Sequence, residues 1–364
     1  MILSVPSCIL HLAHSGHAAP SADNSQPWAF SWDGTWLYLS YDTPRIQGHG
    51  FPPESPATLL AMGGALENIH QAAAEMAQEI DVEPFPDDCP RAHCYAAVTC
   101  SNPDSNKPIS TESPLLQRHT NRFVYRKDPI ETAILETLES ESEGSTRALI
   151  FTRPQEISAI TGLVETASRI RFRTREVHEW LGKSLRFSEK DVKKADGLDV
   201  RTLALPPGGA LFLRFIRDWK RMQLLNRVGG YRLLARIDAR PIAAAPAVVA
   251  ITGPAGRTHA LDAGRLLVRA WTYLNSRGIA VHPYYVVSDQ LFRLDEGKIP
   301  PDLTEDALAL KEESRALLGL GPEEVLYMLL RIGHPTREPP RSRRLPLEAV
   351  FTDLTAKEGS RTVS

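Results

Sequence analysis

The pattern of hydrophobic and polar residues along the chain alternates between a helical and a strand-like period, which predicts a mixed fold. Apolar residues recur at helical spacing in the segments Pro56–Ala77, Leu261–Arg277 and Ala307–Leu318. Runs with the length and composition of strands are Tyr95–Cys100, Arg147–Thr152, Pro246–Thr252, Ile279–Val287 and Val325–Ile332. The alternating run Ala29–Tyr41 contains the pair Asp33-Gly34, which is typical of a tight hairpin. The pattern therefore predicts an α+β fold with mostly antiparallel sheets flanked by helices.

One combination of helix and strand occurs twice in the sequence. Leu60–Pro84 and Leu261–Pro283 each contain a glycine near the start, then a helix rich in small and apolar residues, a short polar turn and a strand that ends in proline. Such similarity favours a duplicated α+β unit.

The composition favours a soluble, cytoplasmic protein that acts on a small molecule. The net charge of −2 at pH 7 gives no global attraction to nucleic acid. No apolar stretch is long enough for a membrane span, and no Lys or Arg precedes the apolar run in Met1–Leu12 as it would in a secretory signal. Cys89, Cys94 and Cys100 lie near His93, but no second pair of ligands follows, so we expect no metal site.

The segment Pro20–Trp28 (PSADNSQPW) is the most informative one for function. Ser21, Asn24 and Gln26 supply hydrogen-bond donors and acceptors just before a rigid Pro-Trp pair. Such a segment suits a planar heteroaromatic ligand that has several carbonyl and ring-nitrogen positions. The alternative is a helix N-cap followed by a turn, because serine, aspartate and asparagine all suit those places.

Two basic segments suit a phosphate group. In Arg118–Phe123 (RHTNRF), Arg118 and Arg122 flank the hydroxyl of Thr120, and forked guanidinium groups bind phosphate oxygens well. A solvent-exposed basic helix start is the alternative for this segment.

The second basic segment, Arg341–Pro346 (RSRRLP), offers Arg341, Arg343 and Arg344. A flexible basic tail is the competing interpretation here.

Together these motifs resemble signatures of the FMN-dependent nitroreductase superfamily. PSADNSQPW is similar to the family's P-S-x-x-N-x-Q-P-W signature, which also precedes an aromatic strand. RHTNRF is similar to the family's phosphate-binding turn, and RSRRLP to the basic pair with which members commonly end.

The resemblance implies FMN as the cofactor and assigns the contacts. The phosphate would be held by Arg118, Thr120 and Arg122 with Arg341, Arg343 and Arg344. Pro20, Ser21, Asn24 and Gln26 form the segment next to the flavin ring, which Ser21 and Asn24 would contact, and Pro283 and Tyr284 would approach its reactive edge. His14 and His17 lie close to this segment and are candidate proton donors, the alternative being two surface histidines in a loop.

The order of the motifs predicts two nitroreductase-like halves fused in one chain. In ordinary members the basic turn comes first and the PSxxN segment follows, whereas this chain has the reverse order. Members are homodimers in which one protomer supplies the phosphate turn and the other the PSxxN segment, so a fused pair builds a single site. We expect one half over residues 1–113, a second over 114–350 with a lid-like insertion at about 185–240 and the basic C-terminal arm, and a disordered tail over 351–364.

The expected function is hydride transfer through flavin N5 to or from a small organic substrate, such as a nitro compound, quinone, enone or biosynthetic intermediate. The hydride donor would be NADPH, NADH or an organic substrate. The chain also resembles a tandem branch of the family with flavin-storing members, so a non-catalytic protein with a lid-covered FMN is an alternative. Another alternative is a partner-binding module without flavin, using the basic stretch Arg214–Arg236. A monomer with a pseudo-dimeric fold and a homodimer are both compatible with the sequence.

Overall fold

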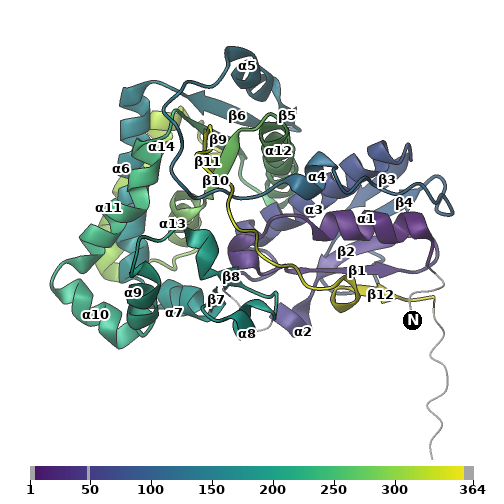
Figure 1. Ribbon diagram of the computed structural model, residues 1–364, viewed down its shortest axis with the longest axis horizontal. Coiled ribbons are helices and arrows are strands. Elements are labelled where there is room, and N and C mark those ends of the chain that lie inside the picture. The colour runs from purple at the N-terminus through teal and green to yellow at the C-terminus, as the bar shows by residue number, and fades with distance from the viewer. Residues whose placement is uncertain (1–4, 47–49, 356–364) are drawn as a thin grey trace, which may run out of the picture.

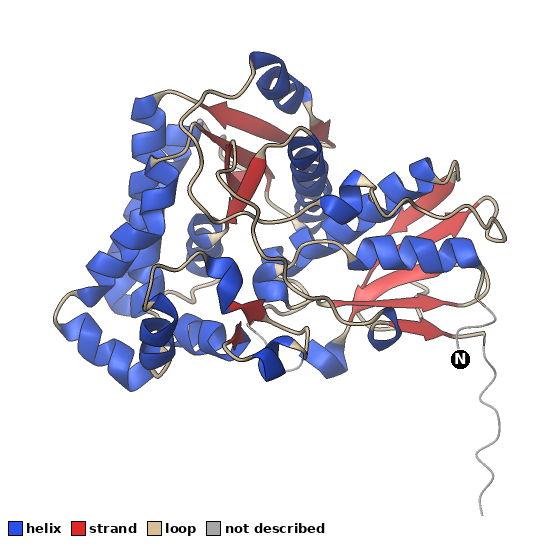
Figure 2. Ribbon diagram, in the orientation of Figure 1, coloured by secondary structure: helices blue, strands red, loops and turns tan. Residues whose placement is uncertain are grey.

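The computed structural model describes residues 5–46 and 50–355. It contains two five-stranded sheets, which Figure 2 shows as two separate groups of strands. The first sheet has the order β12-β1-β2-β4-β3. Its strands are β1 (Trp28–Trp32), β2 (Leu37–Tyr41), β3 (Ile80–Pro84), β4 (Cys94–Cys100) and β12 (Phe351–Asp353). All neighbours in this sheet are antiparallel except β12, which pairs in parallel with β1.

The second sheet is antiparallel throughout and has the order β10-β11-β9-β6-β5. Its strands are β5 (Ser142–Glu143), β6 (Thr146–Phe151), β9 (Ala247–Pro254), β10 (Ala280–Tyr284) and β11 (Glu324–Gly333). A short parallel pair, β7 (Leu185–Arg186) with β8 (Leu198–Asp199), lies outside both sheets. Antiparallel sheets together with many helices define an α+β fold, as the sequence predicts.

The helices surround both sheets (Figure 1). They are α1 (Ser7–His17), α2 (Thr43–Ile46), α3 (Pro56–Glu75), α4 (Pro114–Gln117), α5 (Thr132–Ser140), α6 (Pro154–Arg173), α7 (Arg175–Ser184), α8 (Glu189–Val192), α9 (Gly209–Ile216), α10 (Trp219–Arg227), α11 (Gly230–Ala243), α12 (Arg257–Ser276), α13 (Val286–Asp295) and α14 (Thr304–Leu318). Within the described ranges, no helix combines the length and the apolar composition that a bilayer crossing requires.

Strand β9 is buried on both faces, which explains its unbroken apolar sequence. Val249 belongs to the main core, which extends through α12 and α3 to the first sheet. Val248 and Ala250 point to the opposite face and pack in a second core with α6, α13 and α14. Because successive side chains of a strand point to opposite faces, one strand can support two separate helical layers.

The close contact of α3 with α12 joins the two sheets. A Cβ atom on Gly63 of α3 would lie 2.0 Å from the carbonyl oxygen of Leu261, and a Cβ on Gly264 of α12 would lie 2.3 Å from that of Leu60. The contact is therefore reciprocal, and the four residues hold equivalent places in the two similar units of the sequence. Each helix is also followed by an edge strand, β3 in one sheet and β10 in the other. The two units therefore hold similar places in the two sheets, and their origin by duplication stays a prediction.

Three expectations need correction. Phe351–Asp353, placed in a disordered tail, forms β12, because it pairs with β1; residues 356–364 lie outside the described ranges. The strand expected over Ile279–Val287 ends at Tyr284, and α13 begins at Val286. His14 and His17, for which two surface histidines in a loop were the alternative, lie in helix α1, and His17 is buried. The helix has an apolar face. It forms because Cys8, Ile9, Leu12 and Ala13 bury one face of the turn in the main core.

The contact between α3 and α12 gives a direct test of the fold. We expect Gly63→Ala and Gly264→Ala each to lower the free energy of unfolding by about 3 kcal/mol or more, because backbone carbonyls cannot move aside for the new methyl group. Gly162→Ala, in the middle of α6, is the matched control. Its Cβ meets no heavy atom within 4 Å outside the helix, so it should raise stability by about 0.5–1 kcal/mol. Urea unfolding measures all three; equal effects would show that the helices do not touch in this way.

Candidate functional site

The PSADNSQPW segment connects α1 to β1 in an unusual backbone conformation. Asp23, Asn24 and Gln26 have φ angles of 51°, 58° and 50°, in the left-handed region that residues other than glycine seldom adopt. The hydroxyl of Ser21 accepts a hydrogen bond from the Gln26 amide at 2.9 Å and closes the turn. Three such residues within four positions are an observed strain, and strain of this kind gathers at functional sites.

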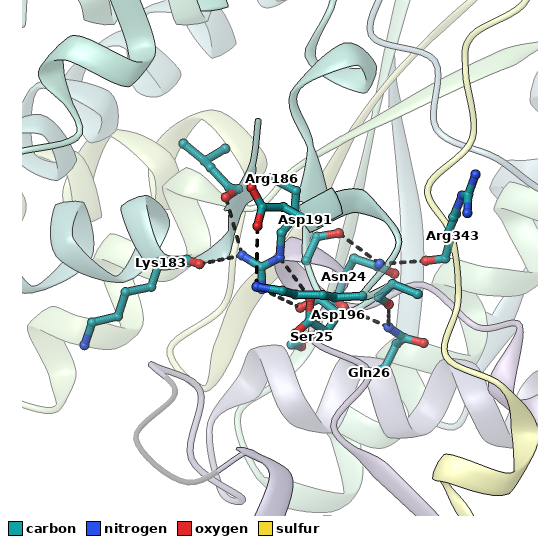
Figure 3. Close-up of polar contacts among 12 residues, drawn as sticks. Asn24, Ser25, Gln26, Lys183, Arg186, Asp191, Asp196 and Arg343 are labelled. Atoms are coloured by element: carbon teal, nitrogen blue, oxygen red, sulfur yellow. Dashed lines mark hydrogen bonds and ion pairs between the residues drawn. The ribbon is translucent and has the colours of Figure 1, made fainter. Parts of the chain in front are cut away.

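The amide side chains of Asn24 and Gln26 connect this segment to two distant parts of the chain. Asn24 Nδ2 donates to the carbonyls of Gly197, at 3.0 Å, and Arg343, at 2.9 Å. Gln26 Nε2 donates to the carbonyl of Ala195 at 2.7 Å, and its Oε1 accepts from the Leu345 amide at 2.9 Å. Figure 3 shows Asn24 and Gln26 with the carbonyl of Arg343 in the C-terminal arm directed at the Asn24 side chain. Both side chains are buried, so they fix these segments in place.

The insertion also binds the segment through Asp23. Its carboxylate accepts hydrogen bonds from Trp180 Nε1, at 3.1 Å, and from the Ser184 hydroxyl, at 3.2 Å. Burial raises the pKa of the Asp23 carboxyl, although these hydrogen bonds and the charge of Arg122 act in the opposite direction. Residues 180–202 therefore cover the segment, whereas α9 and α10 extend away from it (Figure 1).

Arg118 and Arg344 converge at the end of α1. Arg118 donates to the carbonyl of Ala18 at 3.0 Å, and Arg344 donates to the same oxygen at 3.3 Å and to Asn24 Oδ1 at 3.0 Å. The Arg118 guanidinium lies over the ring of Trp271, 4.6 Å from its centroid, and its Nε is buried without a hydrogen-bond partner. Arg118 comes from the loop after α4 and Arg344 from the C-terminal arm, more than two hundred residues later.

These two cations lack a counterion in the described part of the chain, since neither forms an ion pair with a described carboxylate. Burial lowers the pKa of Arg118 to about 9, and the nearby charges of Arg344 and Arg341 add to the effect. Burial likewise lowers the pKa of Arg344 to about 10. Arg118 is buried and Arg344 half-buried, and two like charges in such a place are unfavourable unless an anion joins them, so the arrangement suits an anionic ligand.

A second group of buried basic side chains surrounds Arg122. Burial lowers the pKa of Arg122, and the nearby carboxylate of Asp23 opposes the shift. Arg331 of β11 is 2% exposed, donates to the carbonyl of Phe123 at 2.7 Å and lies over the ring of Tyr125. Burial and the charges of Arg122 and Arg331 hold the pKa of His282 well below its usual value.

The remaining candidates are spread around these two groups. Arg341 is exposed and donates to Gln117 and His119, and Thr120 is half-buried in the same loop as Arg118. The side chain of Arg343 is exposed and points away from Asn24 (Figure 3), so only its carbonyl takes part in the contacts described above. Pro283 pairs with β11, and the hydroxyl of Tyr284 donates to the carbonyl of Asp238 in α11.

His17 has a structural role that its sequence position did not suggest. Trp28 Nε1 donates to its Nδ1 at 2.8 Å, so its Nε2 carries the proton and donates to the carbonyl of Leu345, also at 2.8 Å. Both nitrogens are used within the protein, which leaves its expected role as a proton donor without support. His14 lies exposed on α1.

Sequence reasoning missed several residues of the site. Trp271 of α12 lies under the Arg118 guanidinium, whereas the sequence pattern predicts only that it belongs to an amphipathic helix. Arg331 stands within a strand that is otherwise apolar, and a charged residue in a buried strand is the signal that could have identified it. The carbonyl of Ala18 gave no signal, because its role depends on two distant arginines.

No known family model matches the sequence, and no curated protein matches it. Some solved structures share part of the arrangement. The FMN- and NADPH-dependent nitroreductase NfnB from Sphigopyxis sp. strain HMH is 19% identical over 67% of this chain and 98% of its own, with a TM-score of 0.37. The FMN-dependent nitroreductase NfnB from Mycobacterium smegmatis, in complex with NADPH, is 15% identical over 66% and 95%, with a TM-score of 0.38.

An iodotyrosine deiodinase bound to FMN and 3-iodo-L-tyrosine is 13% identical over 65% of this chain and 96% of its own, with a TM-score of 0.36. At these identities and scores, the likeness does not assign the chain to a family.

The environment of His17 predicts a specific dependence of stability on pH. Burial lowers its pKa to about 4 in the folded chain, against about 6.5 when unfolded. Its contribution is therefore complete above pH 6.5 and is lost as the pH falls towards 4. We expect the difference in unfolding free energy between the wild type and His17→Gln to shrink by about 2 kcal/mol between pH 7 and pH 5. A constant difference would show that His17 is not held neutral.

Proposed function

We propose that the chain binds FMN and acts as an oxidoreductase of the nitroreductase type. One observation carries the proposal: the buried Arg118 and the half-buried Arg344 meet without a described counterion, beside the strained PSADNSQPW segment. The sequence motifs that resemble those of the flavin-binding family are therefore close in space, although they are far apart in the chain.

The donors at this point fit a phosphate monoester. Two guanidinium groups offer forked donors, and the unpaired Nε of Arg118 is a donor that only a ligand or water could satisfy. The dianionic phosphate would offset the repulsion between the arginines and restore their usual pKa values. Trp271 holds the plane of Arg118, and Asn24 holds that of Arg344. The expected contact between Asn24 and the flavin ring is therefore replaced, in this proposal, by a positioning role.

The second group of cations would then lie on the ring side of the site. A bound FMN would supply hydride transfer through its N5 atom, and a positive charge nearby tunes the flavin towards its reduced, anionic form. Arg122, with Arg331 behind it, would supply that charge. Asp23 is a half-buried carboxyl whose pKa is raised by desolvation, and it lies near Arg122, so it can hold a proton near this end of the site.

The substrate class we propose is a small organic acceptor or donor of hydride, with NADPH or NADH as the possible reductant. In this proposal the site forms within one chain, because each half supplies one motif. The PSADNSQPW segment precedes α3 in the first half, and the RHTNRF loop precedes the second sheet. That arrangement corresponds to a fused pair of halves over residues 1–113 and 114–350.

A second candidate function is FMN binding without turnover. The observation that favours it is the cover formed by the insertion. Trp180, Ser184, Ala195 and Gly197 all hydrogen-bond to the PSADNSQPW segment, and Thr202 accepts from Arg122 at 3.3 Å. A segment held by this many contacts could exclude a nicotinamide from the flavin ring.

The phosphate contacts can be tested by comparing FMN with riboflavin, which lacks the phosphate. We expect Arg118→Ala and Arg344→Ala each to weaken FMN binding by about 10- to 100-fold, the usual range for a hydrogen bond to a charged group. Riboflavin affinity should change little. Arg126→Ala is the control, because Arg126 is an exposed arginine that pairs with Asp128. Flavin fluorescence quenching gives all affinities, and equal losses for FMN and riboflavin would place the phosphate elsewhere.

The two candidate functions differ in how the bound flavin is reduced. We expect NADPH, added without oxygen, to bleach the visible absorbance of the FMN-loaded chain. If dithionite bleaches the flavin and neither NADPH nor NADH does, either the storage function or an enzyme reduced by its own substrate is favoured, and a variant of the cover separates the two. If the flavin is stored under the cover, Trp180→Phe, which removes the indole donor to Asp23 but keeps an aromatic ring, should accelerate reduction.

A further inference from the structure

Helices α9, α10 and α11 present an unusually apolar surface. In the described part of the chain, eleven large hydrophobic side chains are exposed, and eight of them lie between residues 205 and 237. They are Leu205, Leu211, Phe212, Phe215, Leu224, Val228, Leu233 and Ile237. We call these three helices with their connecting turns the α9–α11 lobe. Concentration of apolar side chains in one place marks an interaction surface.

The same lobe is strongly basic. Between Gly209 and Ala243 the sequence has eight Lys or Arg residues and two Asp residues. The basic residues, all exposed, are Arg214, Arg217, Lys220, Arg221, Arg227, Arg232, Arg236 and Arg240. Asp238 is already bound by Ser168 and Arg171, and Asp218 caps α10. Because the whole chain has a net charge of −2, this positive charge is a local feature.

Helix α9 shows how the two properties are arranged. Ile216 is buried against the protein, whereas Leu211 and Phe215, four residues apart, form an exposed apolar ridge. Arg214 lies three residues from Leu211 and therefore borders that ridge. An apolar face bordered by arginines is the pattern of helices that lie in the interface of an anionic membrane.

A basic cleft of about 390 Å³ adjoins the lobe. Its lining includes Lys183, Arg186, Lys194, Arg214 and Arg217, against a single carboxylate, Asp191. Asp196 pairs with Arg186, and Asp191 with Lys194, so positive charge remains in excess. Arg214 lies in α9 and Arg217 directly follows it, so the basic cleft lies beside the apolar ridge.

We propose that the α9–α11 lobe docks on the surface of an anionic lipid membrane. The apolar side chains would enter the interface, the arginines would meet the lipid phosphates, and the cleft would accept a headgroup. The chain would be bound at the surface without spanning it. A symmetric contact with a second copy is disfavoured, because it would place two positively charged lobes against each other.

The position of the lobe suits this role. In Figure 1, α9 and α10 lie at the edge of the molecule, away from both sheets. The PSADNSQPW segment binds residues 180–202, and the lobe begins after them. The apolar ridge therefore lies outside the contacts of the proposed FMN site, whereas the cleft shares Lys183, Arg186 and Lys194 with the residues that cover that site. Vesicle binding and FMN binding are measured separately, so failure of either proposal would leave the other standing.

Co-sedimentation of the full chain with lipid vesicles tests the proposal. We expect binding to vesicles of phosphatidylcholine with phosphatidylglycerol, little binding to phosphatidylcholine alone, and loss of binding at high salt. Replacing Arg214, Arg221 and Arg232 together by Gln should weaken binding about 100-fold, since each basic residue near the surface contributes about fivefold. Phe212→Ser with Phe215→Ser should also weaken binding at low salt, where the wild type binds.

Val124→Ser is the matched control, because Val124 is 70% exposed but lies outside the lobe. It should bind vesicles as the wild type does. Light scattering in solution and FMN titration of each variant complete the experiment. Equal binding of all variants, or no binding to the anionic vesicles, would overturn the proposal. Self-association that the Phe212→Ser, Phe215→Ser variant abolishes, without lipid binding, would assign the lobe to contacts between copies.

Discussion

The close approach of α3 and α12 is the contact on which the rest of the structure depends. At Gly63 and Gly264 each helix lies directly against the backbone of the other, which only residues without a side chain permit. Helix α1, which ends beside Ala18, packs on α3, and Trp271, which supports Arg118, belongs to α12. The two parts of the candidate site are therefore held together by the same contact that joins the two sheets.

Within that frame the site combines features that are individually unfavourable. Arg118, which is buried, and Arg344, which is half-buried, are neighbouring like charges, and Asp23, Asn24 and Gln26 adopt backbone angles that cost energy. The fold maintains them because the C-terminal arm and the insertion hydrogen-bond to this segment. Leu345 of the arm binds Gln26, and Gly197 of the insertion binds Asn24. Features that reduce stability are retained where they serve a ligand, and an anion at the arginines would explain why these are retained.

The sequence predicted the elements whose apolar pattern is local: the hairpin at Asp33-Gly34, the long helices α3 and α12, and most strands of both sheets. Its motifs also identified Arg118, Asn24 and Arg344, which the fold brings together. It predicted a lid-like insertion at about 185–240 but not β12, nor the contacts that Trp180 and Ser184 make with Asp23, because these depend on pairing across more than one hundred residues. His17 is the clearest example of this limit. Its hydrogen bonds with Trp28 and Leu345 determine which ring nitrogen carries the proton, and only Trp28 is near it in sequence. Arg331 could have been identified from its apolar neighbours, whereas Ala18 could not.

The central claim is that this chain is a flavin-binding protein. The visible absorption spectrum of the purified full chain, recorded after incubation with FMN and removal of free flavin, tests it most directly. The account predicts a yellow protein that retains a single FMN per chain, with its absorbance shifted from that of free flavin. A colourless protein after this treatment would contradict the account and would leave the buried arginines to a different anion.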